Sequence, residues 1–274
     1  MITTADLHPN QIAQRLTGRD YISWSAITAY QGCSLRYAFR YRVGLPEDTV
    51  SASLVFGGAI HRAAEHAYQE LLAGNPAPSL DALLEAYREG WQDREGRQIL
   101  FGKGDDRTSL DALARRMLAA FQASELADPP GTILGIEEEL RGALIPGVPD
   151  LLARVDLLVD RGDSLTLTDF KTARSRWSEE QVRDSAGQLL LYHELARPIA
   201  EGRPVRLEFV VLTKTKTPEV LRYEVPADPV QIARTKRVVE KVWRAIESEC
   251  FFPAPSAMSC ASCPYRDACR TWVG

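Results

Sequence analysis

The chain has 274 residues, of which 45% are hydrophobic and 26% are charged, and its formal net charge is −4 at pH 7. This composition excludes disordered, fibrous and membrane-embedded classes, and the length suits one core with a sizeable insertion. No apolar run approaches the roughly 18 residues of a membrane span. Met1–Gln11 lacks the basic-then-apolar pattern of a secretory signal, so we expect a cytoplasmic protein with no membrane partner.

Helical spacing of apolar residues dominates the first half of the chain. The segment Tyr21–Tyr41 predicts a helix pair that breaks at Cys33. Gly-rich turns then separate three further predicted helices, at Ala59–Leu72, Leu80 to about Gln98 and Leu110–Glu125. The first of these places His61 near its start. We interpret residues 62–131 as a helical insertion into a single domain that spans residues 1–274.

The hydrophobic period changes to two after residue 131. Alternation predicts strands at Ile133–Leu144, Leu151–Val159 and Leu165–Phe170. A capping signature at Ser178 predicts a helix that runs to about Ala196. A buried strand, a long helix and a Cys-rich tail follow, at Val205–Thr213, Pro229–Glu249 and residues 250–274. Strands flanked by helices predict an α/β fold with a central mixed sheet.

Two acidic residues stand in these apolar strands. Asp156 lies inside one strand, and Asp169-Phe170-Lys171 closes the next. Buried carboxylates are costly unless they are paired or bind a metal. A hairpin would bring Asp156 and Asp169 side by side, and alternation places Asp169 and Lys171 on one face. Such carboxylates suit Mg²⁺ or Mn²⁺. The alternative is that Asp156 pairs with an arginine on an exposed face while Asp169 caps a loop.

Other polar groups accompany this pair. His61 offers a third metal ligand, although a lone helical histidine is more often a surface residue. Gln188 and Tyr192 are four residues apart and share a helix face. Glu137–Glu139 is most simply a solvated strand end, with a supporting acid near the site as the alternative.

The order His61, Asp156, Asp169-Phe170-Lys171 and Gln188-x-x-x-Tyr192 resembles the RecB-like branch of the PD-(D/E)XK nuclease superfamily, from about Tyr21 to Trp272. The resemblance implies a restriction-endonuclease-like core. It also implies that His61, Asp156, Asp169 and the backbone carbonyl of Phe170 bind the catalytic metal. Lys171 would assist the attacking water, and Gln188 and Tyr192 would complete the active site and contact DNA.

Five cysteines form a second pattern, because an odd count in a reducing compartment makes disulfides improbable. The segment before Cys33 resembles the opening of cluster-bearing RecB-like nucleases, with Ser34 where a proline usually stands. Cys250 is interpreted as a buried spare. Four thiolates can bind Zn²⁺ or a 4Fe-4S cluster, and one remote cysteine with three clustered ones favours the structural cluster. The candidate ligands are Cys33, Cys260, Cys263 and Cys269.

These patterns predict a metal-dependent DNA nuclease, with single strands as its preferred partner and exonuclease action in DNA repair or recombination. Because the net charge is negative, DNA would meet local basic groups. Candidate stacking residues are Tyr30, Tyr37, Trp91 and Trp177. The alternatives are a CRISPR-associated adaptation nuclease with adaptation partners and a non-catalytic iron-sulfur DNA-binding subunit that acts with a helicase. A redox protein is disfavoured, since no Gly-x-Gly-x-x-Gly motif follows a strand.

Overall fold

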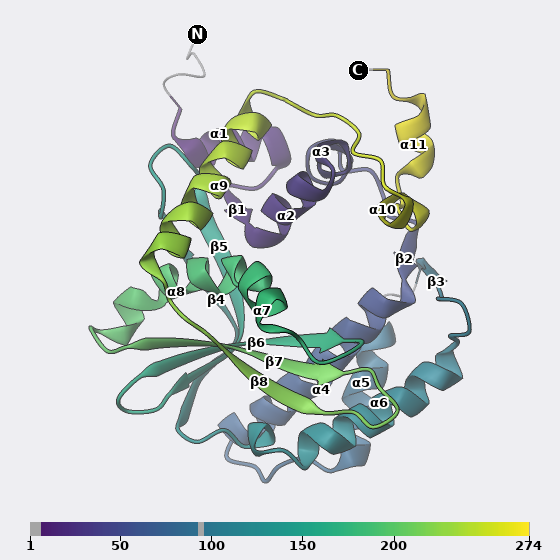
Figure 1. Ribbon diagram of the computed structural model, residues 1–274, viewed down its shortest axis with the longest axis vertical. Coiled ribbons are helices and arrows are strands. Elements are labelled where there is room, and N and C mark those ends of the chain that lie inside the picture. The colour runs from purple at the N-terminus through teal and green to yellow at the C-terminus, as the bar shows by residue number, and fades with distance from the viewer. Residues whose placement is uncertain (1–6, 93–95, 274) are drawn as a thin grey trace. The chain divides into compact units, whose positions relative to one another are not determined.

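The computed structural model describes residues 7–92 and 96–273 (Figure 1). Residues 1–6 of the N-terminal segment and residues 93–95 of a predicted helix lie outside this description. Contacts divide the chain into two compact units. We call Met1–Asp48, Glu139–Ala153 and Asp228–Gly274 the cysteine unit, and Thr49–Glu138 and Arg154–Ala227 the sheet unit. Among the described residues, no helix has both the length and the apolarity needed to cross a bilayer.

The central sheet has the strand order β1-β5-β6-β7-β8, and β4 pairs with β5. Parallel pairs (β1 with β5, β6 with β7) alternate with antiparallel ones (β5 with β6, β7 with β8), so the predicted mixed sheet is confirmed. The strands are β1 Tyr21–Ser23, β4 Thr132–Gly142, β5 Asp150–Asp160, β6 Leu165–Ala173, β7 Val205–Thr213 and β8 Val220–Val225.

Three helices cover one sheet face in the sheet unit. They are α4 Ala52–Leu72, α5 Leu80–Gln92 and α6 Arg107–Gln122, and they share a core with apolar residues of β5, β6 and β7. The prediction that the first helix starts near Ala59 was wrong. Ser51 caps α4 by accepting a hydrogen bond from the Leu54 backbone N–H. His61 therefore lies in the middle of α4. At Gly90 of α5, a Cβ atom would lie 2.8 Å from the Ala59 Cα, so glycine permits this close helix contact.

Two predicted boundaries in this unit also change. The helix from Leu80 does not reach Gln98, because Gln98–Leu100 forms strand β3 and pairs with β2 (Thr49–Ser51). The single helix expected after Ser178 is two helices, α7 (Glu179–Ser185) and α8 (Gly187–Ala200), that meet at Ala186. Helix α8 packs against β6 and β7.

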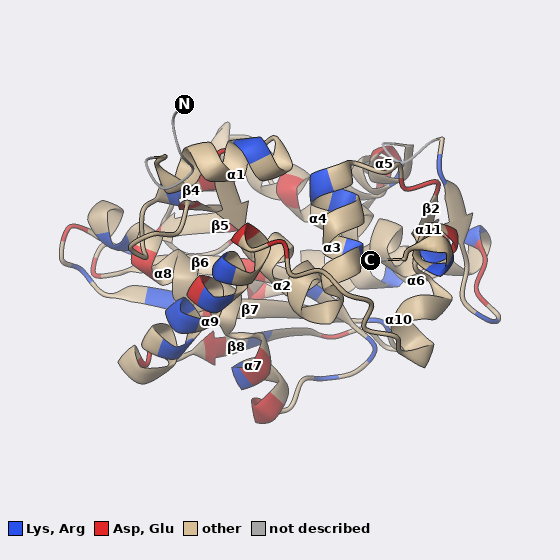
Figure 2. Cartoon of the chain, turned by 90° about the horizontal axis from the view of Figure 1, so that it is seen from above, with Lys and Arg blue, Asp and Glu red and all other residues tan. Residues whose placement is uncertain are grey.

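The predicted helix pair of the cysteine unit is confirmed as α2 (Trp24–Gly32) and α3 (Ser34–Tyr37), with the break at Cys33. Tyr21–Ser23, expected to be helical, is strand β1 instead. A π-helical turn, Ala38–Val43, continues from α3. Figure 2 shows several basic bands along α9. The remaining helices of this unit are α1 Pro9–Thr17, α9 Pro229–Glu247, α10 Ala257–Ala261 and α11 Arg266–Thr271.

Candidate functional site

The β5–β6 ladder positions the two predicted aspartates. Its last recorded pair before the site is Leu157 with Thr168, and Asp156 and Asp169 are the next residues on each strand. Opposed residues of an antiparallel ladder share a face. Beyond this pair, the Phe170 backbone N–H donates to Oδ2 of Asp156 at 2.6 Å. The two carboxylates therefore lie beside each other, and Asp169 is almost fully buried.

Lys171 joins this pair from the same strand as Asp169. Its ammonium group forms a close ion pair with Oδ2 of Asp169. Lys171 Nζ also donates to Oε1 of Gln188 at 3.5 Å. The Gln188 amide nitrogen donates in turn to the hydroxyl of buried Tyr192, at 3.0 Å. Tyr192 thereby orients the amide so that its oxygen faces Lys171. These two residues lie one turn apart on α8, as the sequence spacing predicts.

His61 approaches the carboxylates from α4. Its Nδ1 atom lies 3.5 Å from Oδ2 of Asp156, and its ring packs edge-on against Phe170 at a centroid distance of 6.3 Å. Burial lowers the pKa of His61 to about 4, although Asp169 acts in the opposite direction. The imidazole is therefore neutral at neutral pH, which is the form that binds a metal.

Burial also raises the pKa of both aspartates. It raises the pKa of Asp156 to about 6, against the lowering effects of the Phe170 N–H and Lys171. It likewise raises the pKa of Asp169 to about 6, and Lys171 opposes that shift. Within the described chain, the buried Oδ2 of Asp169 makes no hydrogen bond beyond its ion pair. Two carboxylates and a neutral imidazole fit a divalent cation.

Glu137 of β4 also lies at this site, although the sequence analysis interpreted it most simply as part of a solvated strand end. The ligand atoms of His61, Glu137 and Asp156 all lie within 4.8 Å of one another. Burial, followed by the negative charge of Asp156, raises the pKa of Glu137 to about 7. Its backbone φ is 53°, in the left-handed region, which costs a non-glycine residue about 1–3 kcal/mol. Glu138 and Glu139 are exposed, as expected for a solvated strand end.

The irregular backbone at Glu137 explains why simple alternation missed it. Ile133 and Ile136 both pack against the core of the sheet unit. Their odd separation cannot put both on one face of a regular strand. Strand β4 therefore departs from regular alternation between Ile133 and Ile136. The odd isoleucine spacing was therefore the available sequence signal.

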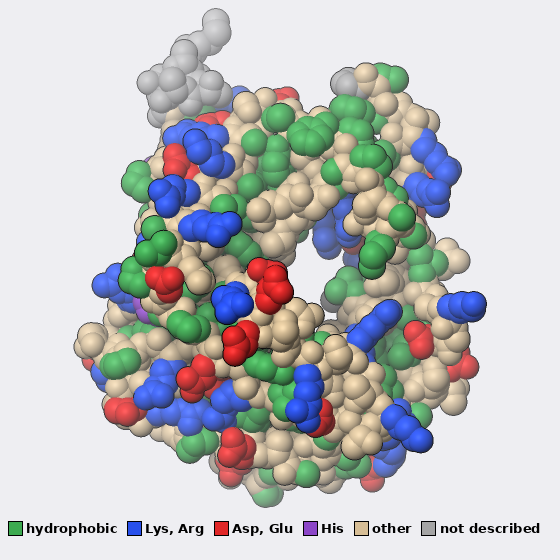
Figure 3. Space-filling view, viewed as in Figure 1, with side chains coloured by type: hydrophobic (Ala, Val, Ile, Leu, Met, Phe, Trp, Pro, Cys, Tyr) green, Lys and Arg blue, Asp and Glu red, His purple; other side chains and the backbone are tan. Residues whose placement is uncertain are grey.

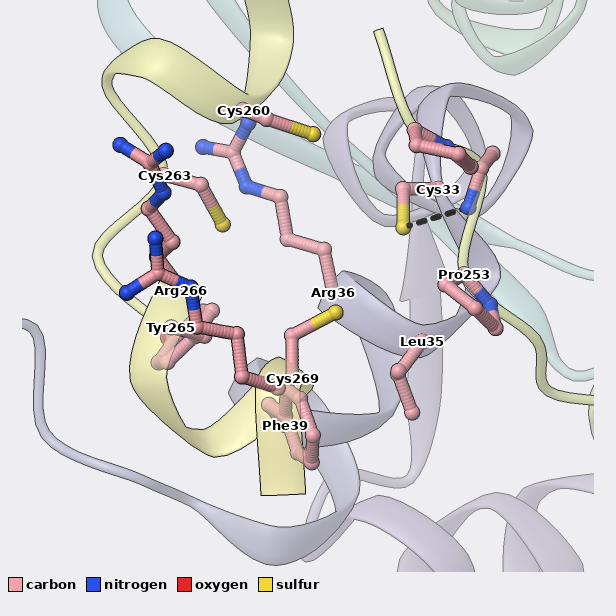
Figure 4. A pocket seen from close by; sticks show the side chains of 13 residues that line it. Cys33, Leu35, Arg36, Phe39, Pro253, Cys260, Cys263, Tyr265, Arg266 and Cys269 are labelled. Carbon is pink, nitrogen blue, oxygen red and sulfur yellow. Dashed lines mark hydrogen bonds between the residues drawn. The ribbon is translucent and has the colours of Figure 1, made fainter. Parts of the chain in front are cut away.

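A second candidate site lies within the cysteine unit. Cys33, Cys260, Cys263 and Cys269 line one cavity of about 200 Å³ (Figure 4). Burial raises the pKa of Cys269, and the other three thiols add to the shift. Backbone N–H groups of Ala254 and Ser256 donate to Cys33 Sγ and Cys260 Sγ, each at 3.4 Å. Cys250 is exposed, so its interpretation as a buried spare was wrong.

The spacing of the sulfurs bears on the kind of group that fits. Thiolates around one zinc ion lie about 3.8 Å apart, since each Zn–S bond is about 2.3 Å. In the described part of the chain, no three of these sulfurs lie within 4.8 Å of one another. The sulfurs of this structure are therefore more widely spaced than the ligands of one zinc ion would be.

The aromatic residues predicted to contact DNA differ in their exposure to solvent. Tyr37 and Trp91 are 2% and 3% exposed, so both belong to the core. Trp177 is partly exposed, and its ring packs on Phe209 at 5.1 Å. Arg176, the basic residue next to Trp177, is paired with Glu219. Figure 3 shows basic and acidic side chains interspersed over the visible face.

Comparison with known proteins bears on the family and on the fold. The model of the PD-(D/E)XK nuclease superfamily matches residues 21–270. The crystal structure of a "putative exonuclease" from Eubacterium rectale is 14% identical, covers 100% of this chain and 94% of its own, and has a TM-score of 0.57, which shows a shared fold. The structure of the protein SSO0001 is 16% identical over 84% of this chain and 89% of its own, with a TM-score of 0.36. Scheffersomyces stipitis Rai1 is 11% identical over 91% and 74%, with a TM-score of 0.27.

Proposed function

Because the chain belongs to the PD-(D/E)XK nuclease superfamily, we propose that it is a metal-dependent deoxyribonuclease that acts in the cytoplasm in DNA repair or recombination. We assign it exonuclease action with a preference for single strands. One observation carries the proposal: Asp156, Asp169 and Lys171 converge at the point where strands β5 and β6 stop pairing, with His61 facing them. We treat residues 1–274 as one nuclease domain, with an insertion at 62–131 and a cluster-binding tail at 250–274.

The cation would be Mg²⁺ or Mn²⁺, held by His61, Asp156, Asp169 and the backbone carbonyl of Phe170. When bound, it supplies Lewis acidity toward a phosphate oxygen and lowers the pKa of water. The Phe170 N–H hydrogen bond fixes one oxygen of Asp156. The neutral imidazole of His61 needs no proton release before it binds a metal.

Lys171 would hold the attacking water and offset phosphate charge. Its ammonium group is placed by Asp169 on its own strand and by Gln188 on α8. Gln188 and Tyr192 are positioning residues in this proposal, since Tyr192 accepts the amide N–H that would otherwise turn toward Lys171. Opposite charges that fix an ammonium before substrate arrives reduce the reorganisation needed in the reaction.

The single-strand preference is supported by Trp177. The Phe209 ring contacts both Trp177, at a centroid distance of 5.1 Å, and the Lys171 ammonium, at 6.0 Å. The Trp177 backbone N–H donates to the Tyr223 hydroxyl, which fixes the base of this residue. A partly exposed, anchored indole beside the site offers a surface for an unpaired base.

The cysteine cavity is assigned a structural 4Fe-4S cluster. Four sulfurs facing one cavity, their wide spacing and two N–H···S hydrogen bonds support a cluster over zinc. The guanidinium groups of Arg36, Arg266 and Arg270 also line the cavity and would offset the negative charge of a thiolate-bound cluster. Residues 33 and 260–269 are far apart in sequence, so such a cluster would close a very long loop.

Labelled DNA tests the function directly. Linear and circular single strands and duplexes are incubated with the anaerobically purified protein in Mg²⁺, Mn²⁺ or EDTA. We expect shortening of linear single strands with either metal, slower loss of duplex, intact circles and no reaction in EDTA. Cleavage of circular DNA would instead indicate that the protein is an endonuclease. Intact linear DNA under every metal condition would defeat the proposed function.

A further inference from the structure

We propose that Glu137 is a direct ligand of the catalytic cation, together with His61 and Asp156. The inference rests on the proposed function and deepens it. The β5–β6 hairpin and α4 supply the ligands expected from the sequence, whereas Glu137 brings a carboxylate from a further strand, β4.

The distances suit one hard cation. Around an octahedral Mg²⁺ with bonds of about 2.1 Å, neighbouring ligand atoms lie about 3 Å apart and opposed ones about 4.2 Å apart. The ligand atoms of His61, Glu137 and Asp156 lie within 4.8 Å of one another. Small side-chain movements would therefore close this group on a single ion. Asp169 is not part of the group, and its buried Oδ2 pairs with Lys171.

A structural role for Glu137 finds weaker support. Its ion pair with Arg154 spans 3.9 Å, and the Arg154 side chain is 59% exposed. Surface pairs of this kind contribute little to folding. Glu65 of α4 also carries negative charge near Glu137, but its Oε1 accepts hydrogen bonds from Arg62 and Gln69 at 2.8 and 2.7 Å. Glu137 is thus left beside Asp156, where two negative groups repel each other without a cation.

The backbone conformation of Glu137 also supports a functional role for this residue. A glycine would adopt the φ of 53° at residue 137 without strain, yet the chain has a glutamate there. Strained residues persist where the surrounding structure over-determines them, commonly at functional sites. Glu137 lies beside His61 and Asp156, while its neighbour Glu138 is exposed. Glu138 is therefore a matched control on the same strand.

Manganese binding tests the proposal without relying on catalysis. Glu137→Gln, Glu137→Gly and Glu138→Gln are made in the full chain with its cysteine site intact. Mn²⁺ affinity is measured by titration calorimetry and by the EPR signal of free Mn²⁺, and melting temperatures are recorded with and without Mn²⁺. Loss of even an outer-shell partner lowers metal affinity about 10- to 100-fold. We expect both Glu137 variants to bind Mn²⁺ at least about tenfold more weakly, and Glu138→Gln to match the wild type.

The melting temperatures separate a ligand from a structural residue. Without metal, we expect Glu137→Gly to melt at or above the wild-type temperature, because it relieves the backbone strain and the repulsion. With Mn²⁺, its gain in melting temperature should be smaller than that of the wild type. Wild-type Mn²⁺ affinity in Glu137→Gln would overturn this inference alone. A wild-type protein that neither binds Mn²⁺ nor cuts DNA would overturn the proposed function and this inference together.

Discussion

The backbone N–H of Phe170 donates a 2.6 Å hydrogen bond to the Asp156 carboxylate at the point where the β5–β6 ladder ends. In a continuing ladder that N–H would bond to a backbone carbonyl. Its transfer to a side chain fixes Asp156 and lets the two strands separate around the acidic residues. The same break that ends the sheet pairing therefore holds one of the two carboxylates of the proposed site.

Lys171→Met should separate catalysis from metal binding. Lys171 contacts Asp169 and Gln188, so its loss removes the charge proposed to hold the water while it leaves the carboxylates in place. We expect cleavage to fall on the order of 100-fold or more, the range of proton-transfer catalysis, with Mn²⁺ affinity kept. Asp169→Asn should lose both cleavage activity and Mn²⁺ affinity. Equal loss of metal affinity in the two variants would argue that Lys171 only holds Asp169.

Tyr192→Phe should show whether α8 acts through Lys171. The substitution removes the acceptor of the Gln188 amide N–H and leaves the buried ring in place. A lost hydrogen bond of this kind costs about 1 kcal/mol of stability. We expect kcat to fall several-fold with little change in KM, because the amide can then turn away from Lys171. A change confined to KM would instead indicate that Tyr192 contacts DNA.

Trp177→Ala should weaken binding of single strands more than of duplexes. Base stacking on an aromatic ring contributes about 1–3 kcal/mol, and Trp177 stands on Phe209 beside Lys171. Trp177→Phe keeps an aromatic surface and serves as the matched control. Fluorescence anisotropy with labelled oligonucleotides in Ca²⁺ measures the affinity. Equal weakening for both DNA forms would assign Trp177 a packing role.

The strand pattern carried most of the site information. Asp156 and Asp169-x-Lys171 interrupt apolar strands at the position where burial makes a charge costly, so their proximity could be inferred from period and turn alone. The count and spacing of the cysteines also singled out four candidate ligands, and these four line one cavity. The acidic pair depends on one hairpin, β5–β6, whereas the cysteines come from two distant segments of the chain.

What the sequence did not reveal depends on backbone detail and tertiary contact. Glu137 enters the site through a left-handed residue in β4, which strict alternation does not anticipate. Helix α4 begins before Gly57-Gly58, since the Ser51 cap and packing outweigh two poor helix formers. Strand β8 was missed although Val220–Val225 alternates, because it gains its stability only by pairing with β7.

In the absence of divalent metal, the acidic residues of the site should make the free energy of unfolding fall as pH rises. Burial raises the folded-state pKa of Glu137 to about 7 from an ordinary 4.5. Below about pH 4 both folded and unfolded chains hold this proton, and the group contributes no penalty. As pH rises from 4.5 to 7, the unfolded chain ionises first, so the free energy of unfolding falls. Asp156 and Asp169 act in the same direction up to about pH 6.

His61 acts in the opposite direction, since its pKa is lowered to about 4 from 6.5, and its contribution is lost as pH falls through that range. Comparing Glu137→Gln with the wild type cancels these other groups. In EDTA, the variant should gain more unfolding free energy at pH 7.5 than at pH 5.5, measured by urea denaturation. An equal gain at both pH values would mean that Glu137 is ionised throughout and that burial does not govern it.

Cys33→Ser should test whether the cysteine cavity holds a cluster that joins distant parts of the chain. Cys33 directly precedes α3, whereas its proposed partners lie in the last 15 residues. Removing one of four ligands should bleach the brown absorbance, lower the iron content and expose the tail to proteolysis. Cys250→Ser is the matched control, because this exposed cysteine does not line the cavity. Since the proposed metal ligands all lie in the sheet unit, any Cys33→Ser protein that stays folded should still bind Mn²⁺. A colourless wild-type protein that contains zinc would replace the cluster by a zinc site and leave the nuclease proposal intact.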